Sequence, residues 1–467
     1  MAVFGVIVSN RSFFPDHLVG TGRRDMTELL AKLGHSAVML DEGATPLGAV
    51  ESITDGKKCA ELFNAHREIE GVIVCLPNFG NEVGISTALR FMDRTVPVLI
   101  QACDDDLAKM DLANRRDAFC GKLSLCAVLR QNNIKYTLTK LHTCRINSCE
   151  FAEDVKKFAK LCDIVNGIST ATVGLVGARV TPFQTVRFSE KLLQQSGILV
   201  ETVDFSMILS AVQALADDDG AVIEAIKELD GKATVCAGIT KEQRVKQAKF
   251  TVALRNWVKE NGCDAAAVQC WDSLEMNFGC AACASMSVIG DEGIPCACET
   301  DVTGAVSMLA LKLASGGAPG LMDWDNNYGD DRDKCVNVHC GNYPQEFFGC
   351  EVEVGCLDIL GTTLGSENCF GALKGRVAAG DMTYLKISTD DANGVIRGYV
   401  GEGEFTDDPL DSFGGVAVCH VENMQGLMHF LAEEGFEHHV AMVRGHHADL
   451  IKEALDKYMN WQITKFE

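Results

Sequence analysis

The sequence has no run of 18 or more apolar residues, the length that a transmembrane helix requires. Basic residues are also scarce: 42 lysines and arginines stand against 65 aspartates and glutamates, which gives a formal net charge of −23. A chain with this excess of negative charge is repelled by nucleic acids and by anionic membranes. We therefore expect neither a nucleic acid nor a membrane among its partners.

Motifs that identify several common enzyme classes are missing as well. No G-x-G-x-x-G or P-loop motif follows the first strand-like segments, which leaves a nucleotide cofactor without support. No G-x-S-x-G motif is present, which weakens the interpretation as a serine hydrolase. The first residues run directly into a strand pattern and lack the basic segment and apolar core of a signal peptide, so we expect a cytoplasmic protein.

Cysteine is abundant by contrast, with 21 residues. The number is odd and no export signal is recognised, so we do not expect a disulfide framework. The pairs Cys280-x-x-Cys283 and Cys296-x-Cys298 suggest zinc binding, but the second spacing is too short and both flanks are apolar. The sequence therefore predicts free thiols, many of them buried as small hydrophobic side chains.

The length and the pattern of the chain predict several domains. A chain of 467 residues exceeds one ordinary core. Apolar runs such as 71–76 and 96–100 alternate with helical patterns, as parallel strands that are buried on both faces require. After about residue 350 the strands become short and glycine-rich, which indicates antiparallel pairing. We predict an α/β protein with two doubly wound parallel-sheet domains, 1–170 and 171–350, followed by a C-terminal antiparallel β-barrel domain, 351–467.

Two carboxylates stand at the ends of short apolar runs in the second predicted domain. Glu299 follows the run 294–298, and Asp323 follows the run 318–322, 24 positions later. Ligand sites of open α/β sheets gather at the carboxyl ends of strands, and this spacing accommodates a crossover helix and a second parallel strand. Helix capping is the competing role, because acidic residues often begin the helix after a strand and a helix is expected over 302–314.

Four of the eleven histidines form two adjacent pairs far downstream, His438-His439 and His446-His447. Neighbouring residues of a strand point to opposite faces, so we expect one ligand among the four rather than several. One imidazole with two carboxylates is a mixed oxygen and nitrogen ligand set. Such a set suits Mn²⁺, with Mg²⁺, Co²⁺ or Fe²⁺ as alternatives, and it leaves open positions for a substrate.

Three segments together resemble the L-fucose isomerase family, which is related to the L-arabinose isomerases. Residues 296–305 (CACETDVTGA) resemble the strand with the metal-bound glutamate, and 318–323 (APGLMD) resemble the segment with the metal-bound aspartate. Residues 438–449 resemble the C-terminal segment with the metal-bound histidine. The resemblance implies that Glu299, Asp323 and His438 bind the metal and that both carboxylates are catalytic.

The resemblance implies aldose–ketose isomerisation of an open-chain sugar. The metal would chelate O1 and O2 of the sugar, and one carboxylate would take the C2 proton to give a cis-enediol that is reprotonated at C1. Which carboxylate is the base stays open, and a hydride shift would use the same ligands. We expect a substrate such as L-fucose or L-arabinose. An isomerase that converts sulfoquinovose to sulfofructose and a non-catalytic sugar-binding protein are the alternatives.

Polar and aromatic side chains are the candidates for binding the sugar: Trp271, Trp324, Asn326, Tyr328, Gln101 and Arg115. Core packing is the competing role of Trp271. An anionic sugar also needs a cationic pocket, for which the candidates are Arg115, Arg116, Arg179, Arg187 and Arg444. Arginines in an acidic chain equally form surface ion pairs. The resemblance further implies a homo-oligomer, a trimer or hexamer, with active sites between subunits and the N-terminal domain of a neighbour over the pocket.

Overall fold

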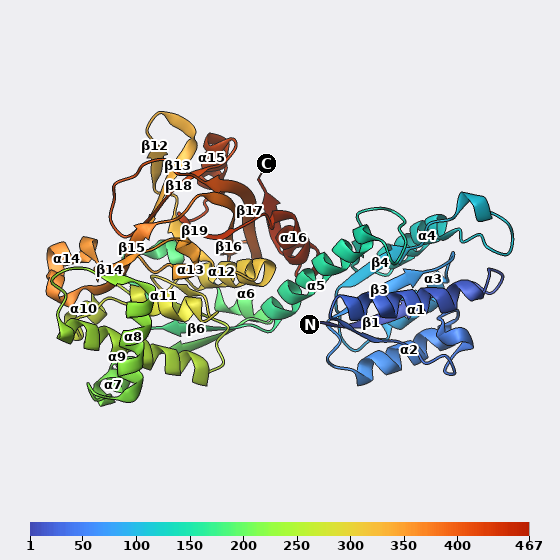
Figure 1. Ribbon diagram of the computed structural model, residues 1–467, viewed down its shortest axis with the longest axis horizontal. Helices are drawn as coiled ribbons and strands as arrows, with labels where there is room; N and C mark the ends of the chain where they lie inside the picture. Colours follow the sequence, from blue (N-terminus) through green and yellow to red (C-terminus); the bar gives the residue numbers. More distant parts are fainter. Residues whose placement is uncertain (467) are drawn as a thin grey trace. The chain divides into compact units, whose positions relative to one another are not determined.

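The computed structural model describes residues 1–466 (Figure 1). The chain forms two compact units that divide between Asn166 and Gly167. No helix among the described residues combines the length and the apolar character needed to cross a membrane. All 21 cysteines are free thiols, and most of them are buried. The predicted boundary near residue 350 stays a prediction, since strands from both sides of it share one sheet, as described below.

The first unit is built on a five-stranded parallel sheet in the order β2-β1-β3-β4-β5. Its strands are β1 (Val3–Val8), β2 (Ser36–Val38), β3 (Gly71–Leu76), β4 (Val98–Ala102) and β5 (Thr137–Leu138). Its helices are α1 (His17–Lys32), α2 (Ile53–Ala65), α3 (Glu82–Arg90), α4 (Ala118–Gln131) and α5 (Cys149–Ser169). Every residue of β3 is buried, as its continuous apolar sequence requires. The predicted parallel α/β architecture is confirmed here.

The second unit begins with a four-stranded parallel sheet in the order β10-β9-β6-β7. Its strands are β6 (Thr172–Val176), β7 (Leu199–Val203), β9 (Ala265–Val268) and β10 (Cys296–Ala297). The helices of this region are α6 (Glu190–Gln195), α7 (Phe205–Ala214), α8 (Gly220–Lys232), α9 (Lys241–Glu260), α10 (Ser273–Asn277), α11 (Cys283–Asp291) and α12 (Val302–Ser315). This sheet confirms the second parallel arrangement that the sequence predicts.

The remaining strands form a mixed sheet along the path β11-β19-β16-β17-β18-β15-β14-β8, to which β12, β13 and β20 are added. Its strands are β8 (Thr234–Val235), β11 (Gly320–Asp323), β12 (Asn326–Tyr328), β13 (Asp331–His339), β14 (Glu353–Cys356), β15 (Phe370–Arg376), β16 (Gly380–Asp390), β17 (Val395–Phe405), β18 (Gly415–His420), β19 (His439–Arg444) and β20 (Gln462–Lys465). The helices are α13 (Gln345–Phe348), α14 (Asp358–Leu364), α15 (Met424–Glu434) and α16 (Ala448–Lys452). Closure of this sheet into a barrel stays a prediction.

The strand that ends in Asp323 departs from the expected topology. β11 pairs antiparallel with β19, and β13 pairs antiparallel with β18, so neither strand continues the parallel sheet. The expectation of a second parallel strand after the crossover helix is therefore wrong. A short apolar run is consistent with either direction of pairing, because its burial does not reveal its neighbours.

Helix α12 lies where the parallel and mixed sheets of the second unit meet. It contacts β9 of the parallel sheet and both β16 and β19 of the mixed sheet. Its sequence, VTGAVSMLALKLAS, is apolar on nearly every side, which is typical of a helix buried among other elements. The helix predicted over 302–314 is confirmed, and its N-terminus brings the segment of Glu299 to the edge of the mixed sheet.

Candidate active site

Glu299 occupies a strained turn directly after β10. Glu299 and Thr300 both have left-handed backbone conformations, with φ of 61° and 59°. Non-glycine residues rarely adopt this region, and such strain, about 1–3 kcal/mol for each residue, is concentrated at functional sites. The amide of Thr300 donates to the carbonyl of Val268 at the end of β9 at 3.2 Å, which holds the turn in place. The Glu299 side chain therefore lies at the carboxyl edge of the parallel sheet.

Asp301, rather than Glu299, caps helix α12. Its Oδ1 accepts hydrogen bonds from the amide of Gly304 at 2.7 Å and from the hydroxyl of Thr303 at 3.0 Å. The fully buried ammonium of Lys386, in β16, donates to Oδ2 at 2.8 Å. Burial opposes the ionisation of Asp301, but Lys386 and His439 outweigh it and hold the pKa of this carboxyl far below its ordinary value. Since Asp301 supplies the cap, the Glu299 carboxylate is left for the site.

His439 lies between these two carboxylates. Its Nδ1 is 2.9 Å from Oδ2 of Asp301, and its Nε2 is 2.9 Å from Oε2 of Glu299. Burial by itself lowers the pKa of His439, but the hydrogen bonds to Asp301 and Glu299 outweigh burial and raise that pKa to about 9. A carboxylate on one ring nitrogen is the arrangement that orients histidine ligands of metal ions. The second nitrogen of His439 is then directed at Glu299.

Asp323 reaches the same place from the edge of the mixed sheet. In the antiparallel pairing of β11 with β19, Asp323 lies directly opposite His439. Its Oδ1 is 3.6 Å from Nε2 of His439 and 3.9 Å from Nε2 of His438. Two carboxylates from different sheets therefore converge on adjacent imidazoles.

Two further imidazoles border the cluster. His339 ends β13, is buried, and lies 5.5 Å from His439 between ring centroids. His438 precedes β19, is 43% exposed, and lies 4.8 Å from His439 between ring centroids. The potential ligand atoms form two sets within 4.8 Å, Glu299 with His339 and His439, and Asp323 with His438 and His439. His439 belongs to both sets and is the centre of the cluster.

The composition of the cluster fits a divalent cation. Oδ1 of Asp323 and Nδ1 of His339 are buried and have no hydrogen-bond partner among the described residues. Such groups are costly inside a protein unless something satisfies them. Carboxylate oxygens combined with imidazole nitrogens are the ligands of divalent metal ions such as Mn²⁺. A divalent ion bound by these residues would compensate the negative charge of the two carboxylates.

Two parts of the chain match known domain families. Residues 5–169 match the family described as fucose/sulfoquinovose isomerase, N-terminal domain, and residues 337–467 match L-fucose isomerase, C-terminal domain. The chain belongs to the fucose isomerase superfamily. The resemblance drawn from three sequence segments is confirmed, and the protein is accordingly a sugar isomerase.

Relatives that align with this isomerase carry one name. The sulfoquinovose isomerase of Alkalicoccus urumqiensis is 26% identical over 363 residues, which cover 75% of this chain and 76% of the relative. The sulfoquinovose isomerases of Priestia aryabhattai and Priestia megaterium are 24% identical over 288 residues, 60% of this chain and 61% of each relative. The chain thus spans about three quarters of the first relative and about three fifths of the other two.

The two tryptophans predicted to bind the sugar lie in different surroundings within the isomerase. Trp271 contacts Phe183, with 5.2 Å between ring centroids, and its indole helps to lower the pKa of the Glu299 carboxyl. The structure therefore brings Trp271 to the cluster. Trp324 donates its indole N–H to the hydroxyl of Tyr399 at 2.9 Å and packs against the core of the mixed sheet. Its polar atom is thus already engaged.

The other predicted sugar-binding residues lie on the β12–β13 hairpin and in the first unit. Asn326 is exposed on β12, and the hydroxyl of Tyr328 donates to the carbonyl of Pro409 at 2.9 Å. Gln101 is fully buried in the first unit and donates to the carbonyl of Cys144 at 2.8 Å. Arg115, in the same unit, pairs with Asp117. Their roles in binding a sugar stay predictions.

Three members of the cluster were not among the site residues predicted from the sequence: Asp301, Lys386 and His339. Asp301 stands two positions after Glu299, in the segment whose capping role was the competing interpretation. Lys386 interrupts an otherwise apolar stretch of strand, where a lysine that faces inward needs a buried partner. His339 ends an apolar run, the same pattern that marked Glu299 and Asp323. The signals were present, but each also has a structural explanation.

Proposed function

We propose that this protein is a metal-dependent aldose–ketose isomerase that acts on an open-chain sugar. The observation that carries the proposal is the convergence of Glu299, Asp323 and His439 at one point in a chain of the fucose isomerase superfamily. These side chains come from a strained turn and from two paired strands, so three separate parts of the fold contribute to the site.

Glu299, Asp323 and one of the adjacent histidines hold the metal in this proposal. The resemblance matched His438, but the contacts favour His439, since one of its ring nitrogens is bound by Asp301 and the other faces Glu299. His438 stands at the exposed rim beside Asp323. Mn²⁺ is the expected ion, and Mg²⁺, Co²⁺ and Fe²⁺ accept the same ligands.

The chemistry then requires two proton-transfer groups. A bound divalent ion would polarise the sugar carbonyl and its neighbouring hydroxyl. Glu299 and Asp323 share the acid and base roles, in which one carboxylate removes the C2 proton and the cis-enediol is reprotonated at C1. Burial opposes the ionisation of Glu299, but His439 and His339 outweigh it and hold its pKa below its ordinary value, so the side chain is a carboxylate at neutral pH. Positioned proton transfer contributes about 10²–10⁴-fold to a rate.

The names of the relatives favour an anionic hexose over a neutral sugar. The three relatives described above are all called sulfoquinovose isomerase. Sulfoquinovose carries a sulfonate at C6 in place of a hydroxyl. Conversion of sulfoquinovose to sulfofructose is therefore our first candidate reaction, ahead of the isomerisation of L-fucose or L-arabinose expected from the sequence.

An isomerase screen tests the proposal. Metal-stripped protein would be incubated with and without Mn²⁺ and with sulfoquinovose, L-fucose, L-arabinose or D-arabinose, and ketose formation would be measured. We expect Mn²⁺-dependent turnover that falls by at least about 10²-fold in Glu299→Gln and Asp323→Asn. Glu260→Gln, which alters an exposed carboxylate at the end of α9, is the matched control and should behave as wild type. Full activity in Glu299→Gln would exclude the proposed role of that carboxylate.

The fate of the transferred hydrogen tests the cis-enediol. In D₂O, a carboxylate that exchanges its proton with solvent should place deuterium at C1 of the ketose product. A product without deuterium after complete conversion would favour the hydride shift, which keeps the hydrogen within the sugar. Mass spectrometry of the isolated product distinguishes the two.

We also propose that the isomerase is a homo-oligomer with its active sites between subunits. The family resemblance supports a trimer or hexamer, in which Gln101 and Arg115 of a neighbour approach the sugar. Light scattering after size-exclusion chromatography should give a multiple of the chain mass of 50.4 kDa. A monomeric and fully active enzyme would exclude shared active sites.

A further inference from the structure

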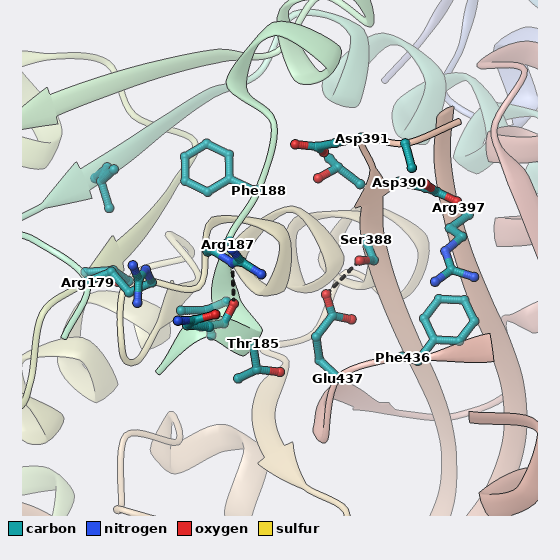
Figure 2. Close-up of a pocket in the computed structure, with 17 residues that line it drawn as sticks. Arg179, Thr185, Arg187, Phe188, Ser388, Asp390, Asp391, Arg397, Phe436 and Glu437 are labelled. Carbon is teal, nitrogen blue, oxygen red and sulfur yellow. Dashed lines mark hydrogen bonds between the residues drawn. The ribbon is translucent and has the colours of Figure 1, made fainter. Parts of the chain in front are cut away.

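A cavity of about 800 Å³ lies beside the β16–β17 hairpin in the second unit (Figure 2). One wall comes from the segment after β6, which includes Arg179 and Arg187. The other wall includes Ser388, Arg397 and Glu437. The volume is large enough for a hexose and several water molecules, since pockets for small ligands begin at about 300 Å³.

The cavity borders the candidate metal cluster. Thr300 and Glu437, which line it, are the sequence neighbours of Glu299 and His438. Phe183, on the same segment as the two arginines, packs 5.5 Å from the rings of both His438 and His439. A sugar held at the cluster by its carbonyl end therefore has space to extend into the cavity.

Arg179 and Arg187 are cationic side chains of this cavity whose hydrogen bonds go to backbone carbonyl groups. Arg179 bonds to the carbonyl oxygens of Val180 and Thr181 at 2.9 and 3.2 Å, and Arg187 bonds to the carbonyl oxygen of Gln184 at 3.1 Å. Within residues 1–466 neither guanidinium lies in an ion pair with a carboxylate. Surface ion pairing, the competing role for these arginines in an acidic chain, is therefore not what the structure shows.

The opposite wall carries charged groups of both signs. Arg397 is paired with Glu434 at 3.3 Å and stacks on Phe436. Asp390 accepts a hydrogen bond from Asn393 at 2.7 Å. Asp391, also in the lining, is exposed at the hairpin turn. The two arginines thus face a wall with three carboxylates, Asp390, Asp391 and Glu437, and one arginine that is already paired.

Glu437 offers a hydrogen-bond acceptor next to the cluster. Its Oε1 accepts from the hydroxyl of Ser388 at 2.6 Å. Its Oε2 is buried and has no hydrogen-bond partner in the described part of the chain. Such an atom is satisfied by a hydroxyl of a ligand, and sugars supply hydroxyls along their whole length.

We propose that this cavity is the subsite for an anionic group at the end of the sugar remote from its carbonyl, with Arg179 and Arg187 as the specificity-determining residues. Guanidinium groups bind sulfonate, carboxylate and phosphate oxygens through charge-assisted hydrogen bonds. Glu437 accepts a hydroxyl between the cluster and the arginines. The inference rests on the proposed isomerase function and adds the residues that distinguish an anionic sugar from a neutral one.

Kinetics with matched sugars test the subsite. Wild type, Arg179→Ala, Arg187→Ala and the double variant would be assayed with sulfoquinovose and with D-quinovose, its neutral counterpart that lacks the sulfonate. Loss of one charge-assisted contact should lower kcat/KM for sulfoquinovose by about 10- to 100-fold, mainly through KM. Turnover of D-quinovose should be unchanged, and Arg187→Lys should keep part of the selectivity because it keeps the charge.

Two comparisons complete the kinetic test. Arg332→Ala removes an exposed arginine from β13, away from the cavity lining, and should leave both sugars unaffected. Glucose 6-phosphate and glucuronate identify the anion, since the natural group should show the largest loss in the double variant. An unchanged KM for every anionic sugar in the double variant, or an equal loss with D-quinovose, would overturn the proposal.

A binding measurement separates the subsite from the isomerase function. Metal-stripped wild type should bind sulfoquinovose in a calorimetric titration, and the double arginine variant should bind it at least about tenfold more weakly. If binding depends on the arginines but the Mn²⁺-loaded enzyme converts none of the sugars, the proposed isomerase function is refuted and the proposed subsite is supported. If turnover is normal but binding does not depend on the arginines, the isomerase function is supported and the subsite is refuted. No binding of any anionic sugar by wild type would refute the subsite.

Discussion

The buried pair of Lys386 and Asp301 permits a test in which stability and activity should separate. Both side chains are fully buried, and the ammonium lies 2.8 Å from the carboxylate that also caps α12 and holds His439. Lys386→Met removes the ammonium group from this buried carboxylate and leaves His439 as its neighbour. Breaking a buried ion pair in this way costs about 3–5 kcal/mol.

A second substitution should restore the stability. Asp301→Asn combined with Lys386→Met removes both charges and keeps an oxygen that accepts from the amide of Gly304. Replacing a whole buried ion pair by neutral groups of similar size is often neutral or stabilising. We therefore expect the double variant to unfold within a few degrees of wild type, whereas Lys386→Met should unfold on the order of 10 °C lower.

The activity of the double variant should not recover. His439 loses the carboxylate on its Nδ1, and the loss of such a partner typically lowers metal affinity about 10- to 100-fold. Differential scanning calorimetry measures the unfolding temperature of each variant, and titration with Mn²⁺ measures its metal affinity.

A partly exposed ion pair supplies the control. Lys334 lies 2.8 Å from Asp408, and both side chains are about one quarter exposed. Lys334→Met should leave the unfolding temperature close to that of wild type, because solvent screens such a pair. A Lys386→Met variant as stable as wild type would contradict the energetic cost assigned to the broken ion pair. A double variant no more stable than Lys386→Met would contradict the expected rescue.

Three further predictions follow from other parts of the second unit. Burial raises the pKa of Glu275 from 4.5 to about 8, so its ionisation destabilises the fold as pH rises through that range; Glu275→Gln should raise Tm at pH 9 and leave it nearly unchanged below pH 5. His439→Ala should weaken Mn²⁺ binding in calorimetry more than His438→Ala, and the opposite order would favour the ligand expected from the sequence. A Cβ at Gly320 would lie 2.6 Å from the ring of Phe347, so Gly320→Ala should lower stability in thermal unfolding by about 1–3 kcal/mol through overpacking, and an unchanged Tm would contradict this.

Local sequence patterns predicted several residues of the candidate site. Glu299 and Asp323 were found because each ends a short apolar run, and the run and the polar residue after it are adjacent in sequence. The start of α12 at Val302 was predictable for the same reason, since Asp301 caps it from the preceding position. The family resemblance also depends on short continuous segments.

Other features of the site depend on contacts between residues that lie far apart in the sequence. The sequence placed a ligand at His438, whereas the pairing of β11 with β19 sets His439 opposite Asp323. Trp324 is polar at one atom only, and whether that atom is available depended on Tyr399, 75 positions away.

The charged residues show most clearly which features the sequence determines and which features depend on the tertiary structure. The sequence by itself determined that this is an acidic α/β chain with two carboxylates at strand ends and the segments of a sugar isomerase. It did not determine that Lys386 would be buried on Asp301, or that Arg179 and Arg187 would lack carboxylate partners. The energy of a charge depends on its burial and on its neighbours in space, and both are set by segments that meet only when the chain has folded.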